Sequence, residues 1–150
     1  MRGARTTEIK VRGYHLDFYG HVNNARYLEF LEEARWALFE DRLDLKDLRR
    51  RGLAFYVVNI NINFRHPAGL GDLLQVTGRF VRFGSRSGVL RQEILRKGTP
   101  AMVADADVTF VIADPQSGVA LPLEGELRAL IESLAPGPAE EPDSGPARTA

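Results

Sequence analysis

The residues best suited to chemistry are concentrated in one short stretch, YHLDFYGHVNNARYLEF, at positions 14–30. Ahead of its aromatic-rich end it contains two histidines, one aspartate, a glycine and two adjacent asparagines: His15, His21, Asp17, Gly20, Asn23 and Asn24. Imidazole and carboxylate groups can bind a metal or move protons, and Asp and Asn side chains also cap helices. Three interpretations are therefore open: a metal site, a helix cap and a catalytic carboxylate.

The metal interpretation rests on His15, Asp17 and His21, with His66 as a distant fourth ligand. Their spacing matches no established metal motif, so this interpretation is the weakest of the three. Capping is stronger on residue type alone, because Asp and Asn side chains satisfy free N–H groups at a helix start. A cap explains one asparagine but does not require Asp17, which lies further upstream.

The catalytic interpretation uses the helix start itself. Free backbone N–H groups and the positive end of the helix dipole point toward an incoming anion, which is the arrangement of an oxyanion hole. A carboxylate held nearby by a tight turn at Gly20 can attack a carbonyl carbon or deprotonate a water that does so. A thioester suits so modest a nucleophile because a thiolate leaves easily.

The composition indicates one soluble domain. A chain of 150 residues with 44% hydrophobic residues can fill a single core. Lys plus Arg and Asp plus Glu both number 20, so net charge gives no pull toward nucleic acid or an anionic membrane. There is no cysteine, which excludes disulfides, a thiol nucleophile and thiolate zinc ligands. Without a signal-like N-terminus or a membrane-length apolar run, we expect a cytoplasmic protein.

The pattern of apolar residues predicts the elements that position these groups. Apolar side chains at helical spacing from Tyr27 to Phe39 predict a long helix, and extra aromatics around it indicate that other structure wraps it. Two shorter helices are predicted, one ending at the C-capping Gly52 and an amphipathic one from Leu127 to Leu134. Period-two alternation or short apolar runs predict strands in TTEIKVRG, VVNININF, DLLQVTGRFVRF, SGVLRQEILRKG and AMVADADVTFVIAD.

Short connections between the strands favour antiparallel pairing. The expected fold is therefore α+β, with an antiparallel five-stranded sheet wrapped around the long central helix. In VVNININF, the residues Val58, Ile60, Ile62 and Phe64 are expected to share one buried face. The domain is expected over residues 1–135, followed by a disordered Pro/Gly/Ala-rich tail at 136–150.

The stretch DFYGHVNNARY resembles the Asp-x-x-Gly-His-Val-Asn-Asn-x-x-Tyr signature of hotdog-fold acyl-CoA thioesterases, the 4-hydroxybenzoyl-CoA thioesterase group. The segments VRGYHLD, HVNNARYLEFLEEARW, VVNININ and LEGELR further resemble the bacterial long-chain acyl-CoA thioesterases of type III in that group. The resemblance covers nearly the whole chain except the tail. It implies the hotdog fold, in which a sheet wraps a long helix.

The resemblance also implies roles for individual residues. Asp17 falls on the catalytic carboxylate, Asn24 on the backbone N–H that polarises the carbonyl, and Tyr27 on the signature tyrosine beside the substrate. Asp17 can act as nucleophile or general base, and we favour base-assisted attack by water. Many relatives carry an acidic residue where this chain has His15, so that histidine is either a partner of Asp17 or a packed side chain.

A basic turn is the candidate site for the coenzyme A phosphates. In related hotdog enzymes a basic segment near this position meets the nucleotide. Here the turn VRFGSRSG offers Arg82, Ser85, Arg86 and Ser87. An ordinary solvated hairpin is an equally good interpretation, and Arg65 with His66 forms a weaker candidate patch.

The expected activity is hydrolysis of medium- to long-chain fatty acyl-CoA to free fatty acid and CoA, without metal or cofactor. A tunnel lined by helix aromatics and sheet aliphatics would hold the acyl chain. The resemblance implies a homodimer or homotetramer in which two sheets join and the site lies between protomers. Alternatives are a non-catalytic acyl-CoA-binding module and an aryl-CoA or acyl-carrier-protein thioesterase. A hydratase is less favoured, because the hotdog hydratases have an Asp-x-Asn-Pro-x-His pattern and this chain has no proline there.

Overall fold

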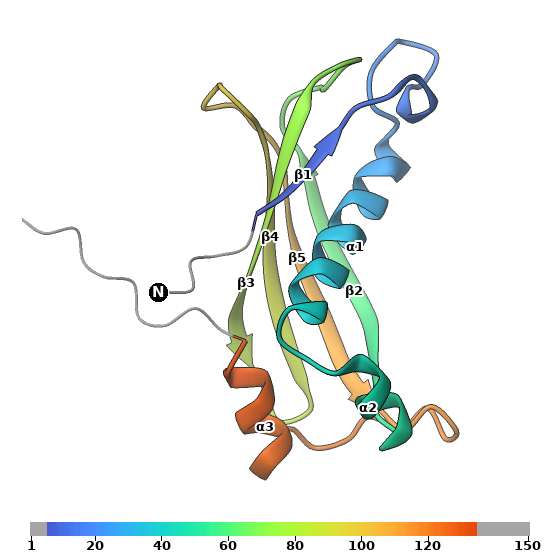
Figure 1. The fold of residues 1–150 in the computed structure, drawn as a ribbon, viewed down its shortest axis with the longest axis vertical. Coiled ribbons are helices and arrows are strands. Elements are labelled where there is room, and N and C mark those ends of the chain that lie inside the picture. Colours follow the sequence, from blue (N-terminus) through green and yellow to red (C-terminus); the bar gives the residue numbers. More distant parts are fainter. Residues whose placement is uncertain (1–5, 135–150) are drawn as a thin grey trace, which may run out of the picture.

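The computed structural model describes residues 6–134, which form one antiparallel sheet curled around a long helix (Figure 1). In chain order the elements are β1 (Thr7–Lys10), the 3-10 turn η1 (Gly13–His15), α1 (Asn24–Glu40), α2 (Leu45–Arg50), β2 (Ala54–Phe64), β3 (Leu73–Phe83), β4 (Ser87–Arg96), β5 (Met102–Ala113) and α3 (Gly125–Glu132). Residues 1–5 and 135–150 lie outside the described range, and with them the tail predicted over 136–150.

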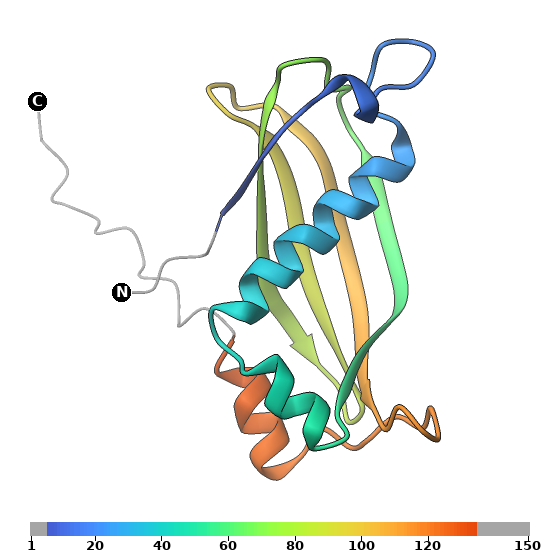
Figure 2. The ribbon, with the colours of Figure 1, turned by 45° about the vertical axis from the view of Figure 1, so that its right-hand side comes forward.

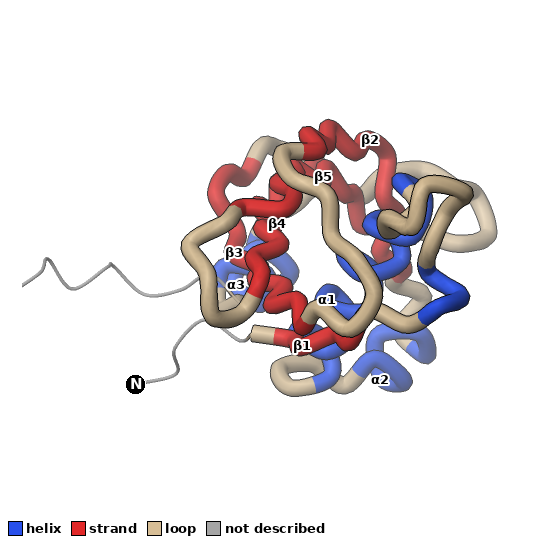
Figure 3. The backbone as a smooth tube through the Cα atoms, turned by 90° about the horizontal axis from the view of Figure 1, so that it is seen from above, coloured by secondary structure: helices blue, strands red, loops and turns tan. Residues whose placement is uncertain are grey.

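The strands follow the order β1-β3-β4-β5-β2, and every neighbouring pair is antiparallel. Figure 2 shows α1 crossing the concave face of the sheet, with α2 and α3 together at one end of the molecule. The end-on view in Figure 3 shows the strands as an arc around α1. This arrangement confirms the predicted α+β architecture. No helix within residues 6–134 combines the length and apolar character needed to cross a membrane.

Helix α1 starts where an asparagine caps it. The Asn23 side-chain oxygen accepts a hydrogen bond from the Ala25 N–H at 2.9 Å. The buried side chains of α1 then recur every three or four residues: Tyr27, Phe30, Leu31, Ala34 and Leu38. Other structure wraps the helix less fully than predicted within one chain, because Leu28 and Trp36 are 40% and 51% exposed.

Strand β2 forms one free edge of the sheet, and a β-bulge changes its predicted pattern. Ile60, Ile62 and Phe64 lie opposite apolar residues of β5. Ile60 and Ile62 are half-buried, but Phe64 is 51% exposed, so the expected burial of Phe64 is wrong within one chain. However, Val57 pairs with Phe110 and Asn59 with Thr109, so Val58 is the extra residue of the bulge and is 57% exposed. The expectation that Val58 belongs to the buried face is therefore wrong. Val57 pairs with Phe110 in its place but is itself 44% exposed.

A buried carboxylate on the outer face of the sheet fixes the end of β2. Asp105 is 4% exposed and accepts a hydrogen bond from Asn63 Nδ2 at 3.0 Å. Arg65 Nε donates to Asp105 Oδ2 at 2.6 Å, and Arg91 Nη2 lies 3.5 Å from Oδ1, the oxygen that accepts from Asn63. The hydrogen bond from Arg65 holds the pKa of Asp105 below its usual value. This network anchors the segment that follows β2.

Candidate active site

The loop between η1 and α1 holds Asp17 in a tight turn. The Asp17 N–H donates to the His21 carbonyl at 2.8 Å, and the Gly20 N–H donates to the Asp17 carbonyl at 3.1 Å. Gly20 has φ of 77°, a left-handed conformation that a residue with a side chain rarely adopts. The turn is therefore fixed by main-chain hydrogen bonds and by the left-handed conformation of Gly20.

The Asp17 carboxylate has one oxygen fixed and one free. Oδ1 accepts hydrogen bonds from the N–H groups of Tyr19 and His21, at 2.9 and 3.2 Å. None of residues 6–134 donates a hydrogen bond to Oδ2. Half-buried Asp17 therefore presents an oriented oxygen that can accept a proton or attack an electrophile.

The two asparagines at the start of α1 have separate roles. Asn23 accepts hydrogen bonds from Ala25 through its side chain and from Arg26 through its carbonyl, each at 2.9 Å. Within residues 6–134 the Asn24 N–H has no acceptor, as expected for a first-turn donor. The capping and oxyanion interpretations left open by the sequence are thus compatible. Asn23 caps the helix, and Asn24 supplies the backbone N–H that has no acceptor among the described residues.

These groups meet in one cavity of about 480 Å³. It is lined by Asp17, His21, Val22, Asn24, Tyr27, Phe64, Arg65, His66 and Pro67. Tyr27 is buried, and burial raises the pKa of its phenol, although a hydrogen bond with the Ala68 backbone opposes that effect. The cavity therefore combines a carboxylate, a helix start and an aromatic wall, as the signature implied.

The end of β2 contributes more to this cavity than the sequence indicated. Arg65 and His66 were the weaker candidate patch, yet both line the cavity with Asp17. The Nδ1 atom of His66 lies 2.8 Å from the carbonyl oxygen of Met102, so Nδ1 carries the proton in the neutral ring. The Nε2 atom is then an acceptor. Arg65 and His66 come close to Asp17 because the sheet curls, and no local sequence pattern predicts this.

The basic turn between β3 and β4 lies at the opposite end of the molecule from the Asp17 loop (Figure 1). The Asp17 loop adjoins the segment before β3, through a hydrogen bond from the Val22 N–H to the Ala68 carbonyl. The turn with Arg82, Ser85, Arg86 and Ser87 follows after β3 has run about 36 Å, at about 3.3 Å per residue. Within one chain the basic turn therefore lies far from Asp17. The contact of this turn with CoA stays a prediction.

His15 is a packed histidine and does not contact Asp17. Its ring is buried, with Nδ1 accepting a hydrogen bond from the Arg12 N–H at 2.9 Å and its edge against Phe30. Burial, and to a smaller degree the charge of Arg26, lowers the pKa of the imidazole. Among residues 6–134, no three His, Cys, Asp or Glu side chains gather in a way that could hold a metal ion.

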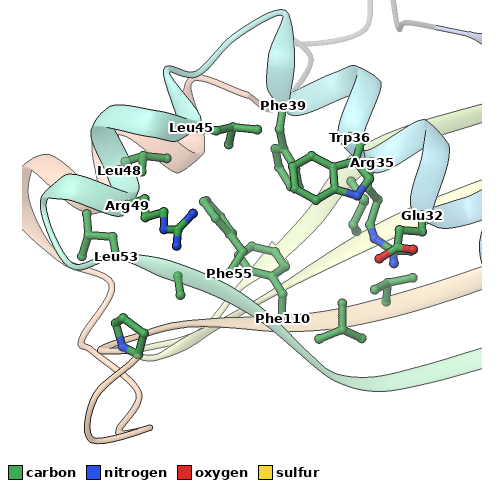
Figure 4. Close-up of a pocket in the computed structure, with 15 residues that line it drawn as sticks. Glu32, Arg35, Trp36, Phe39, Leu45, Leu48, Arg49, Leu53, Phe55 and Phe110 are labelled. Atoms are coloured by element: carbon green, nitrogen blue, oxygen red, sulfur yellow. The ribbon is translucent and has the colours of Figure 1, made fainter.

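A second cavity, of about 390 Å³, lies toward the other end of α1 (Figure 4). Helix aromatics line one wall through Trp36 and Phe39, and sheet residues line the opposite wall through Phe55, Val57 and Phe110. Helix α2 closes the far end with Leu45, Leu48 and Arg49. This apolar space has the lining that was expected for an acyl tunnel.

Residues 11–131 match the family model of the Thioesterase-like superfamily, and the chain belongs to that superfamily. It is 52% identical over 128 residues to the long-chain acyl-CoA thioesterase FadM of Escherichia coli strain K12, an alignment covering 85% of this chain and 97% of that protein. The crystal structure of YbaW, a probable thioesterase from Escherichia coli, is 51% identical, with a TM-score of 0.82 over 87% of this chain and 98% of that one.

A more distant solved structure shows the shared fold alone. Slr0204 from Synechocystis, a 1,4-dihydroxy-2-naphthoyl-CoA thioesterase, has a TM-score of 0.76 at 24% identity, over 88% of this chain and 98% of that one. Together these comparisons confirm the predicted hotdog fold and the assignment of the chain as a thioesterase.

The buried His15 predicts a dependence of stability on pH. Its pKa in the folded protein is below the value of about 6.5 expected in the unfolded chain. The unfolded chain therefore binds the proton more readily, and the free energy of unfolding decreases as pH falls below about 6.5. Urea unfolding at pH 7.5 and 5.5 should show a smaller decrease in His15→Gln than in the parent. His21→Gln, at an exposed histidine, is the control, and an equal decrease in all three proteins would rule out His15 as its source.

Proposed function

We propose that this chain hydrolyses the thioester of medium- to long-chain fatty acyl-CoA to a free fatty acid and CoA. The observation that carries the proposal is the presence in one cavity of the Asp17 Oδ2 and the Asn24 N–H, neither of which has a hydrogen-bond partner among residues 6–134. Membership of the Thioesterase-like superfamily and the similarity to a relative named as a long-chain acyl-CoA thioesterase support the choice of substrate.

In the proposed reaction, the thioester carbonyl oxygen accepts a hydrogen bond from the Asn24 N–H. The dipole of α1 stabilises the negative charge that develops on that oxygen. Asp17 Oδ2 removes a proton from water, and the water oxygen bonds to the carbonyl carbon. When the intermediate collapses, the C–S bond breaks and CoA leaves as a thiolate. The proton from Asp17 is then available to that thiolate.

The acyl chain is proposed to follow the open side of α1. Leu28 and Phe64 are 40% and 51% exposed, so an apolar path leads from the Asp17 cavity along the helix. A rise of about 1.5 Å per residue places Arg35 about 16 Å along α1 from Asn24. Extended methylenes advance about 1.3 Å each, given C–C bonds of about 1.5 Å, so chains of about 12 carbons or more reach the second cavity.

A second copy of the chain is proposed to pair along the free edge of β2, giving a homodimer that can assemble further into a tetramer. Tyr56 and Val57 are exposed on that edge, and unpaired strand edges readily accept another strand. Antiparallel pairing would reverse the partner, so its basic turn would lie at the same end as the first copy's Asp17. The proposed CoA contacts of Arg82, Ser85, Arg86 and Ser87 are therefore assigned to the second copy.

Replacing the carboxylate tests the chemistry. Asp17→Asn keeps the oxygen that accepts from Tyr19 and His21 but removes the base, so kcat should fall by at least about 10² while acyl-CoA binding persists. Release of free thiol from palmitoyl-CoA measures turnover. Asp114→Asn is the matched control, because Asp114 accepts a hydrogen bond from the Gln116 N–H in a similar turn after β5. Near-normal turnover of folded Asp17→Asn would refute the assignment, whereas absence of thiol release by the parent protein would favour a non-catalytic binding module.

Removing the backbone donor tests the oxyanion hole. Asn24→Pro deletes the N–H, and Asn24→Ala keeps it. Proline is tolerated at the first helical position, and Asn23 already has ψ of 136°, which suits a residue before proline. Asn24→Pro should lose roughly 10² to 10³ in kcat relative to Asn24→Ala. Circular dichroism checks the fold of both, and equal kcat values in two folded variants would place the oxyanion hole elsewhere.

Filling the second cavity tests the path of the acyl chain. Ala54→Trp adds bulk to its wall, so kcat/KM for palmitoyl-CoA should fall about tenfold while that for hexanoyl-CoA changes little. Ala129→Trp, at an exposed position of α3, is the control for adding an indole. Equal losses for both substrates in Ala54→Trp would show that the acyl chain does not enter this cavity.

A further inference from the structure

One end of the second cavity is lined by Arg35, which a buried amide behind it holds in place. Arg35 Nη1 donates a hydrogen bond to Gln92 Oε1 at 3.1 Å, and Gln92 Nε2 donates to the Leu31 carbonyl at 3.0 Å. Gln92 is 1% exposed, so its amide is held between helix and sheet. Within residues 6–134 the remaining N–H groups of Arg35 have no acceptor. An arginine with four unused donors is thus held at the cavity wall.

The described part of the chain supplies no ion pair to the guanidinium of Arg35. No carboxylate of residues 6–134 lies within 4.0 Å of its guanidinium. Burial lowers the pKa of Arg35, and the negative charge of Glu32 on the same wall opposes this only in part. A partly desolvated cation gains more from an anionic partner than an exposed one does, because water screens the pair less. The cavity therefore favours a ligand with a carboxylate at this end.

The rest of the cavity suits a hydrocarbon chain. Figure 4 shows Arg35 and Glu32 at one end, Phe39, Phe55 and Phe110 in the middle, and the leucines of α2 at the other end. Arg49 also lines that far end, but its side chain is exposed and its charge is solvated. The cavity thus has the half-buried guanidinium of Arg35 beside the exposed carboxylate of Glu32 at one end, and an apolar length beyond them. A fatty acid whose carboxylate reaches Arg35 complements both parts.

We propose that this cavity binds a free long-chain fatty acid, with its carboxylate on Arg35 and its chain among the aromatic rings and the leucines of α2. The site is separate from the Asp17 cavity. One consequence rests on the proposed function: the fatty acid is also the product of hydrolysis. When it occupies the cavity, it excludes the distal part of a long acyl chain, so inhibition is selective for long-chain substrates.

The binding experiment uses the protein without substrate. Trp36 is the one tryptophan of the chain and lines the cavity, so its fluorescence reports occupancy. Dodecanoate and dodecanol, both kept below micelle-forming concentrations, have the same chain and differ in the charged head. Dodecanoate should change the fluorescence with a Kd about tenfold lower than dodecanol, the scale of one charge-assisted contact. Equal Kd values, or no fluorescence change with dodecanoate, would overturn the proposal.

Two arginine variants locate the carboxylate. Arg35→Leu should remove the preference for dodecanoate over dodecanol, whereas Arg49→Ala should keep it within about twofold. The reverse result would place the head at the far end and refute the proposed orientation. Asp17→Asn should bind dodecanoate as the parent does, and loss of binding there would assign the ligand to the Asp17 cavity. Measuring the two ligands on the parent protein keeps the test valid if Arg35→Leu does not fold.

The kinetic experiment separates this inference from the proposed function. Dodecanoate should inhibit hydrolysis of palmitoyl-CoA at concentrations that leave hexanoyl-CoA hydrolysis unchanged. Equal inhibition of both substrates would show that the fatty acid acts at the Asp17 cavity instead and would overturn the separate site. Absence of any hydrolysis would refute the proposed function, while the binding of dodecanoate at Arg35 would still be decided by fluorescence.

Discussion

The Asp17 cavity depends on how the backbone N–H groups at the start of α1 are satisfied. A helix start leaves several donors without intrahelical acceptors. Asn23 takes up those of Ala25 and Arg26, and the Asn24 donor is left without a partner in the described chain. Because the donor belongs to the backbone, the side chain at position 24 is not what the proposed chemistry requires. The cap at Asn23 fixes the start of the helix and so orients the Asn24 N–H.

Helix α1 relates two cavities of different character. Its N-terminal end adjoins a polar cavity lined by one carboxylate and two imidazoles, and its C-terminal half adjoins an apolar cavity with one half-buried guanidinium. The sheet covers the face of the helix that carries Leu31 and Ala34 and leaves Leu28 and Trp36 uncovered. The covered face of α1 therefore forms the core, and the uncovered face offers a surface along which a long ligand can lie.

Local patterns predicted much of this arrangement. Helical spacing located α1, period-two alternation located the strands, and the polar stretch gave Asp17 and Asn24, which the fold brings into one cavity. The bulge at Val58 could not be predicted, because an extra residue is defined only by pairing with β5. Likewise, Arg65 and His66 reach the cavity through the path of β2 and the curl of the sheet, which are not local properties.

Contacts between distant segments were also beyond the sequence. Gln92 is one of several polar residues in β4, and only the packing of β4 against α1 shows that it holds Arg35. The basic turn was a sound local pattern for phosphate binding. Its position after the whole length of β3 nevertheless places it far from Asp17 in the same chain. Spacing along the chain does not reveal which end of a sheet a turn occupies.

The two edges of the sheet differ, and this difference limits how copies of the chain can associate. β1 has only four residues, with the charged side chains of Glu8 and Lys10, whereas β2 has eleven and carries the bulge. The proposed pairing of β2 with β2 about a two-fold axis uses the same edge on both copies. Such an association is closed at that edge: each β2 has one open side, so the contact joins two chains and offers no site on β2 for a third.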